Sequence, residues 1–222
     1  NSLIEGKTGI DRISSFDPEP FASQVAGEVK NFVVSDFIDK KEAKRMDRFT
    51  QFAVAATKLA MDDSNLTITD EMSERVGVLV GSGIGGLSTL EQQCDVLSKK
   101  GPDKVSPFFI PMLIANMASG QISIRYKARG PNFCIVTACA TGAHCIGESY
   151  NIIKRGLADV MIAGGSDAAI TPMSVAGFGN MKALTRRNDD PAKACRPFDK
   201  DRDGFIIAEG ACVLILEALE LA

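Results

Sequence analysis

Cys139 has the sequence surroundings of a nucleophile. It follows the run Phe133-Cys-Ile-Val-Thr137, which predicts a strand, and it opens a helix predicted over residues 139–155. The unpaired N–H groups and the positive dipole end at a helix start favour a thiolate over a thiol. A sharp strand-to-helix turn also exposes the side chain that it carries, as the serine elbow of α/β-hydrolases does. Cys139 is therefore the candidate for nucleophilic chemistry.

Helical spacing gives Cys139 a second predicted property. It begins a row of residues three or four positions apart, which lie on one face of a helix. The row continues through Ala143, Ile146, Tyr150, Ile153 and Leu157. We expect this row to be buried and Cys139 to face the interior. On spacing alone, a structural core cysteine at a helix start stays an open alternative.

The single histidine, His144, does not suit the role of a base for Cys139. Five positions along a helix place it about 140° around the axis, on a different face, so we expect a surface or packing role. The other cysteines form no CxxC pair and no metal-like spacing, which predicts no metal site and mostly buried, reduced thiols of a cytosolic protein. These residues are Cys94, Cys134, Cys145, Cys195 and Cys212.

Composition narrows the class of protein. The 222 residues are enough for a sizeable core, and 45% hydrophobic with 24% charged residues is ordinary for a globular protein. No apolar run approaches the ~20 residues that span a bilayer, and the first residues lack a signal-peptide pattern. A net charge of −3 gives no reason to expect nucleic acid as a partner.

Buried strands alternate with helices along the chain. Helices are predicted over residues 39–64, 87–99, 111–124 and 139–155; strands over 76–80, 133–137 and 160–163; and a terminal hairpin over 205–208 and 211–217. This order predicts an α/β layered fold. No repeat, low-complexity segment or flexible linker interrupts it, so we expect one domain over residues 1–222.

A basic stripe is predicted on the first of these helices. Lys41, Lys44, Arg45 and Arg48 fall at i, i+3, i+4 and i+7. Such a stripe suits an acidic partner through electrostatic steering, although an ordinary solvated helix face would have the same pattern.

Two motifs resemble a dinucleotide site and a calcium site, but each lacks a required feature. Gly81, Gly83 and Gly86 satisfy G-x-G-x-x-G, but no second strand ending in an acidic residue follows at the distance that a dinucleotide site requires. A glycine loop that allows close backbone approach explains these residues better. Asp199 begins an EF-hand-like run, yet its twelfth position is Gly210 in place of the bidentate glutamate, so we do not expect calcium binding.

Several motifs in register resemble one family. They are Thr137-Ala-Cys-Ala-Thr-Gly142, Gly81-Ser-Gly-Ile-Gly-Gly86, Ser106-Pro-Phe-Phe-Ile-Pro111, Val160-Met-Ile-Ala-Gly-Gly165 and Arg196-Pro-Phe-Asp-Lys-Asp-Arg-Asp-Gly-Phe205. Over essentially the whole chain, the order and spacing are similar to those of the elongating type II β-ketoacyl-acyl-carrier-protein synthases, which have the thiolase fold. The resemblance implies a central mixed sheet with flanking helices.

The resemblance also implies roles for particular residues. Cys139 would accept the acyl group, with its own N–H in the oxyanion hole. Ile84 would be the gate beside the acyl chain, although core packing stays open for it and for the other apolar residues. The other residues of the acyl pocket or its gate would be Phe109, Ile110 and Phe178. The residues that meet the acyl carrier protein would be Lys41, Lys44, Arg45 and Lys182.

The family fold has two similar halves, and its second half carries two histidines and a lysine that decarboxylate the malonyl group. The chain ends at Ala222, after the strand that closes the first half, and lacks the opening strand. We therefore expect an N-terminal half that can be acylated but cannot complete condensation, with the opening strand and C-terminal half missing.

The expected function is an acyltransferase of fatty acid elongation that takes acyl groups from acyl carrier protein. The alternatives are a thiolase acting on coenzyme A esters and a non-catalytic half-domain that binds carrier or dimerises. The resemblance implies a homodimer and no cofactor. The expected compartment is the bacterial cytosol, with a plastid or mitochondrion as alternatives.

Overall fold

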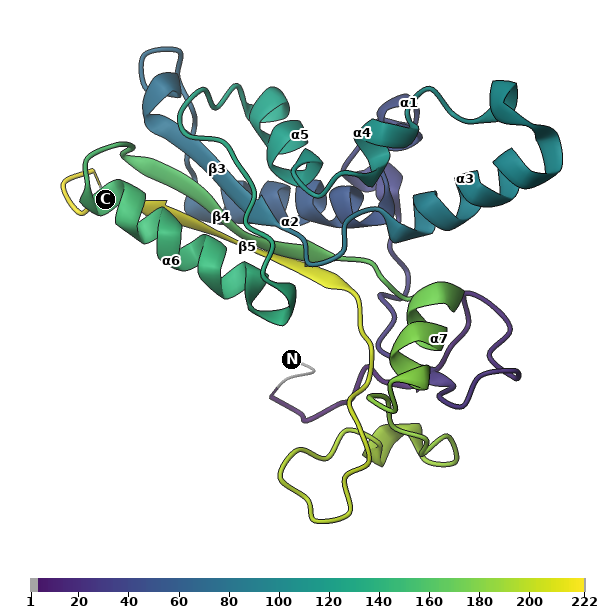
Figure 1. Cartoon of the computed structure of the whole chain (residues 1–222). Helices are drawn as coiled ribbons and strands as arrows, with labels where there is room; N and C mark the ends of the chain where they lie inside the picture. Colours follow the sequence, from purple (N-terminus) through teal and green to yellow (C-terminus); the bar gives the residue numbers. More distant parts are fainter. Residues whose placement is uncertain (1–3, 222) are drawn as a thin grey trace. The chain divides into compact units, whose positions relative to one another are not determined.

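A computed structural model describes residues 4–221 and divides the chain into two compact units (Figure 1). The sheet unit consists of residues 33–168 together with the segment from Gly210 onward. The loop unit consists of the chain up to Phe32 together with Ala169–Glu209. The single domain expected over residues 1–222 stays a prediction.

The sheet unit is built on a three-stranded mixed sheet in the order β3-β4-β5. β3 (Val76–Gly81) runs parallel to β4 (Val160–Asp167), and β5 (Gly210–Glu217) runs antiparallel to β4. All six residues of β3 are buried, as expected for an apolar run without alternation that is covered on both faces. Gly81, the last residue of β3, pairs with Gly165, and β4 continues beyond this pair to Asp167.

Helices cover both faces of this sheet (Figure 1). α6 (Thr141–Lys154) lies on one face, where Leu79, Cys145, Ile152 and Met161 form a buried cluster. α2 (Arg48–Ser64) and α5 (Met117–Tyr126) lie on the other. The remaining helices of the unit are α1 (Lys40–Ala43), α3 (Leu87–Lys100) and α4 (Phe109–Leu113). Among residues 4–221, no helix has the length and apolar character that a membrane crossing requires.

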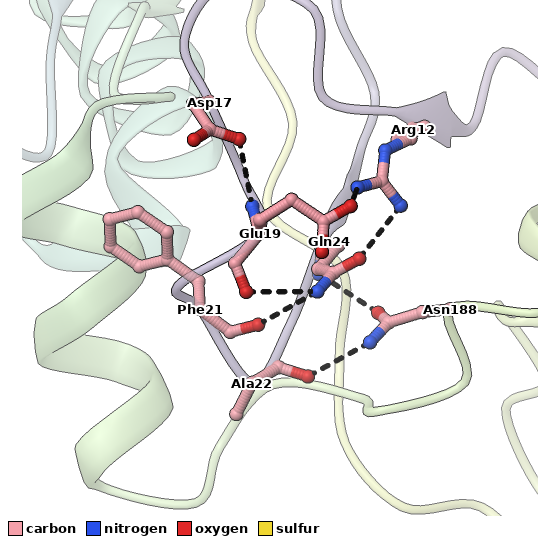
Figure 2. Close-up of polar contacts among 7 residues, drawn as sticks. All are labelled: Arg12, Asp17, Glu19, Phe21, Ala22, Gln24 and Asn188. Atoms are coloured by element: carbon pink, nitrogen blue, oxygen red, sulfur yellow. Dashed lines mark hydrogen bonds and ion pairs between the residues drawn. The ribbon is translucent and has the colours of Figure 1, made fainter.

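The loop unit has little regular structure. It contains the antiparallel pair β1 (Asp11–Arg12) and β2 (Val25–Ala26), and α7 (Pro172–Asn180), which begins with a capping box between Thr171 and Ser174. A polar network holds its N-terminal and C-terminal segments together (Figure 2). In it the Gln24 N–H donates to Asn188 Oδ1 at 2.8 Å, and Asn188 Nδ2 donates to the carbonyl of Ala22 at 3.1 Å.

The structure corrects the predicted helix boundaries. The helix predicted over residues 39–64 is two helices, because buried Asp47 accepts a hydrogen bond from the Phe49 N–H and starts α2 anew. The helix predicted over 111–124 is also two, since the backbone of Ile114 is extended after α4.

Two predicted strand features are wrong. Residues 133–137 form no strand, and Asn132, just before them, makes an isolated bridge with Val78 of β3. The terminal hairpin is absent as well: β5 pairs with β4, while Phe205 and Ala208 make isolated bridges elsewhere in the loop unit. Alternation of apolar and polar residues predicts a strand but does not identify its partner. The sequence therefore could not distinguish a hairpin from pairing with β4.

Candidate functional site

Cys139 lies exposed in a short 3-10 turn, Ala138–Ala140, that leads directly into α6. The residue before it, Ala138, has a positive φ of 51°. This left-handed conformation is unfavourable for a residue with a Cβ and persists only where the surroundings hold it. The turn predicted around Cys139 is therefore present, although the strand predicted before it is not.

The prediction that Cys139 faces the interior is wrong. The buried row of α6 is Thr141, Cys145, Ser149 and Ile152, which faces the sheet. Residues of the predicted row lie elsewhere: Ala143 and Tyr150 of α6 are exposed, Tyr150 to 59%, and Leu157 lies beyond the end of α6 and is 54% exposed. α6 has apolar residues on both sides, so spacing alone could not tell which side the sheet would cover.

Hydrogen bonds tie the residues around the turn to α6. The Thr137 N–H donates to Thr141 Oγ1 at 2.9 Å, and the Ala140 N–H donates to the Thr137 carbonyl at 3.1 Å. The Thr137 hydroxyl lies 2.7 Å from Nδ1 of the exposed His144. His144 thus contacts the segment that precedes Cys139. Helical spacing did not predict this contact.

A glycine loop after β3 is held by Asp167, which ends β4. Asp167 Oδ1 accepts hydrogen bonds from the Ser82 hydroxyl at 2.8 Å, the Gly83 N–H at 3.0 Å and the Ile84 N–H at 3.3 Å. The Gly85 N–H in turn donates to Ser82 Oγ at 2.9 Å. Asp167 was not among the site residues predicted from the sequence. An acidic residue two positions after Val160-Met-Ile-Ala-Gly-Gly165, at the end of a buried strand, was the available signal.

The glycines of this loop allow close backbone contacts. A Cβ on Gly83 would lie 3.2 Å from the carbonyl oxygen of Ala138, beside the Cys139 turn. A Cβ on Gly86 would lie 2.2 Å from the carbonyl oxygen of Met112 in α4. Such contacts, rather than a dinucleotide, account for the G-x-G-x-x-G spacing.

The apolar residues implied for an acyl pocket lie in different units. Ile84, on the glycine loop, is 42% exposed, and Ile110, in α4, is 56% exposed, so neither packs into the core of the sheet unit. Phe109 is half-buried in α4. Phe178 belongs to α7 in the loop unit, where its ring makes an edge contact with Phe205 at 5.4 Å.

The four basic residues predicted as one helical stripe do not share a helix. Lys41 lies in α1, Lys44 and Arg45 lie in the turn after it, and Arg48 begins α2. Lys41, Lys44 and Arg45 are exposed, and the Arg45 guanidinium lies 4.6 Å from the ring centre of Phe108, next to α4. The Arg48 guanidinium lies at the same distance over Phe52. The charges remain clustered at a bend instead of lying along one face.

Lys182 lies in the loop unit, exposed and with a positive φ of 57°. It lines a cavity of about 790 Å³ together with Arg196 and Arg202. In the EF-hand-like run beside this cavity, Asp203 accepts hydrogen bonds from Thr185 and Arg186, which lower the pKa of its carboxyl. Residues 4–221 contain no cluster of three or more histidine, cysteine or acidic side chains arranged to hold a metal ion.

The prediction of mostly buried thiols is wrong for three of the other five cysteines. Cys94, Cys195 and Cys212 are exposed, and no cysteine is in a disulfide. Burial raises the pKa of the Cys145 thiol and that of half-buried Cys134. Exposure alone thus does not single out Cys139; its position in the turn does.

Comparisons with known proteins agree with this geometry. The family model "Beta-ketoacyl synthase, N-terminal domain" matches residues 1–222. The chain is 54% identical over 220 residues to 3-oxoacyl-[acyl-carrier-protein] synthase 2 of Synechocystis sp., covering 99% of this chain and 53% of that protein. It is 53% identical over 221 residues to the protein of the same name from Staphylococcus aureus (strain N315), again covering 53% of it. The chain therefore spans about half the length of these curated relatives.

Solved structures show the same fold. A β-ketoacyl synthase from Burkholderia phymatum STM815 matches with a TM-score of 0.86 and 27% identity, and the ishigamide ketosynthase/chain length factor with 0.87 and 32%. Both matches cover all of this chain and 54% of the other. A ketosynthase in complex with a type II PKS acyl-carrier protein matches with 0.82 and 29%, covering 97% of this chain and 52% of that one. The predicted thiolase-like α/β fold is confirmed, and the chain belongs to the β-ketoacyl synthase family, whose N-terminal domain it matches.

Proposed function

We propose that this chain is the acyl-accepting half of a β-ketoacyl-acyl-carrier-protein synthase, an acyltransferase of fatty acid elongation. The observation that carries the proposal is the exposed Cys139 in a turn where Ala138 holds a left-handed conformation at the start of α6. A cysteine exposed in this way can reach a bulky thioester, and the positive end of a helix dipole favours a thiolate.

The proposed step is a thioester exchange at Cys139. Its sulfur attacks the carbonyl carbon of an acyl group on the phosphopantetheine of a carrier protein, and the Cys139 N–H donates to the oxyanion. The bond from that carbon to the carrier sulfur then breaks, and the carrier leaves as a thiol with the proton of Cys139. Condensation with a malonyl carrier needs the histidines and lysine that the family resemblance places outside this chain.

Exposed apolar residues on the glycine loop and on α4 support an acyl substrate. Ile84 and Ile110 are large, exposed and attached to the glycine loop and to α4, and the Gly86 N–H links these elements by donating to the Leu113 carbonyl at 2.9 Å. We assign Ile84, Phe109, Ile110 and Phe178 to the acyl pocket or its gate.

The proposed partner is an acidic acyl carrier protein, bound by Lys41, Lys44, Arg45 and Lys182. Similarity to a ketosynthase solved in complex with an acyl-carrier protein supports this partner. We further propose a homodimer, and, because the curated relatives named above are bacterial proteins, a bacterial cytosolic location.

The test is to incubate the chain with an acyl-carrier thioester and locate the adduct by peptide mass spectrometry. We expect acylation at Cys139 and none at the exposed Cys94, Cys195 and Cys212, which serve as internal controls. Cys139→Ala should abolish the adduct. Labelling spread over the exposed cysteines would contradict the nucleophile assignment. Faster acylation from acyl-coenzyme A than from the carrier would favour a thiolase.

A further inference from the structure

Asp167 connects the end of β4 to the glycine loop and, through it, to the Cys139 turn. We propose that Asp167 is a positioning residue that keeps Cys139 in its reactive place. The proposal rests on the assignment of Cys139 as the nucleophile, which it deepens. It concerns how the chain holds a strained turn, and the carboxylate itself contacts no reacting atom.

The first step is the hydrogen bonding of the loop. One carboxylate oxygen of Asp167 accepts from three donors, the hydroxyl of Ser82 and the N–H groups of Gly83 and Ile84. The second oxygen lies 3.3 Å from the Gly83 nitrogen. Hydrogen bonds from backbone N–H groups to an ionised carboxylate are among the stronger ones, so the loop is fixed at its first residues.

The second step is contact between the loop and the turn. Gly83 lies so close to the Ala138 carbonyl that even a Cβ would stand 3.2 Å from the oxygen. Ala138 is the residue with a φ of 51°. Its left-handed conformation is unfavourable for a residue with a side chain, so neighbouring backbone must oppose its relaxation. Gly83, held by Asp167, is the neighbour on this side.

The third step distinguishes the effect of the position of Cys139 on its alkylation from the effect of the charge of Asp167. The alkylation of a cysteine consumes its thiolate, and a nearby negative charge disfavours a thiolate. Removing the charge of Asp167 would therefore speed alkylation of Cys139 if charge alone mattered. Relaxation of the turn would move Cys139 from its exposed position before α6 and slow its alkylation. The sign of the change thus distinguishes the two effects.

The experiment measures alkylation of each cysteine in the full, folded chain by iodoacetamide, followed by peptide mass spectrometry. The variants are Asp167→Asn and Ser82→Ala, which weaken the same set of hydrogen bonds from opposite sides. The matched control is Glu28→Gln in the loop unit, where a carboxylate likewise accepts from two backbone N–H groups, those of Ser14 and Ser15.

We expect both loop variants to lower the Cys139 rate at least about threefold relative to Cys94 and Cys195, and Glu28→Gln to leave this ratio unchanged. An unchanged or raised ratio in both loop variants overturns the proposal. Ser82→Ala keeps the test decisive if Asp167→Asn does not fold. Alkylation needs no acyl transfer, so a wild-type chain without an acyl adduct would refute the proposed function and leave this measurement intact.

Discussion

Ala138 is the residue whose backbone conformation gives Cys139 its exposed position. Its φ of 51° predicts different outcomes for two substitutions. Ala138→Gly should keep the free energy of unfolding within about 1 kcal/mol of the wild-type value, because relief of strain offsets the greater entropy of the unfolded chain. Ala138→Val should lower it by about 1–2 kcal/mol, because a β-branched residue fits this region poorly.

Urea unfolding followed by circular dichroism measures both changes. The matched control is Ala143→Val, an exposed position inside α6, which should cost only the difference in helix propensity, about 0.5 kcal/mol. Equal losses for valine at positions 138 and 143 would contradict the role given to the turn.

The residues of the site differ in how visible they are in the sequence. Cys139 could be found from the sequence, because an apolar run before it and small residues after it form a local pattern that predicts a turn. The partners of Asp167 and Thr137 could not be found, since Ser82 and His144 are brought to them by the pairing of β4 with β3 and by the rotation of α6. A local pattern does not contain that information.

At the scale of elements, an ion pair joins the residues directly before β3 and β4. Arg75 Nε and Nη2 donate to the two carboxylate oxygens of Asp159, at 3.0 and 2.6 Å. The hydrogen bonding from Arg75 lowers the pKa of Asp159. A carboxyl with a lowered folded-state pKa contributes stability above its unfolded pKa of about 3.9, and loses it as the pH falls through the folded value.

Asp159→Asn should therefore reduce stability near pH 6 and have a smaller effect near pH 3. The measurement is the difference in thermal midpoint between the variant and the wild-type protein across this range. The difference should be modest, because both side chains are about two-fifths exposed. A difference that stays constant with pH would show that the loss comes from packing.

Elements were predictable where one local signal decides them. Apolar runs that end in glycines predict β3 and β4, and helical spacing predicts α3. All three appear within a few residues of the predicted places. The break at Asp47 was not predictable, because this residue also accepts from the Thr89 N–H and hydroxyl at 3.0 and 2.6 Å, a contact 42 residues along the chain. Tertiary contact here overrides a continuous helical pattern.

At the scale of the whole molecule, the net charge of −3 makes the chain slightly acidic, so the chain as a whole does not attract an acidic partner. The proposed docking surface is a local exception, where Lys41, Lys44 and Arg45 are exposed together at the bend between α1 and α2. Arg45 also lies over Phe108, so its substitution would change packing as well as charge. Lys41 and Lys44 give the cleaner test.

The double variant Lys41→Glu/Lys44→Glu should weaken binding to an acidic carrier protein roughly tenfold at low salt, chiefly by slowing association. The loss should shrink as added salt shortens the range of the interaction to about 10 Å at 0.1 M. The control is Lys100→Glu/Lys104→Glu, the same change of net charge at exposed lysines around the end of α3. Surface plasmon resonance at several salt concentrations measures both. If the two double variants lose equal affinity, net charge rather than this bend attracts the carrier, and the docking assignment fails.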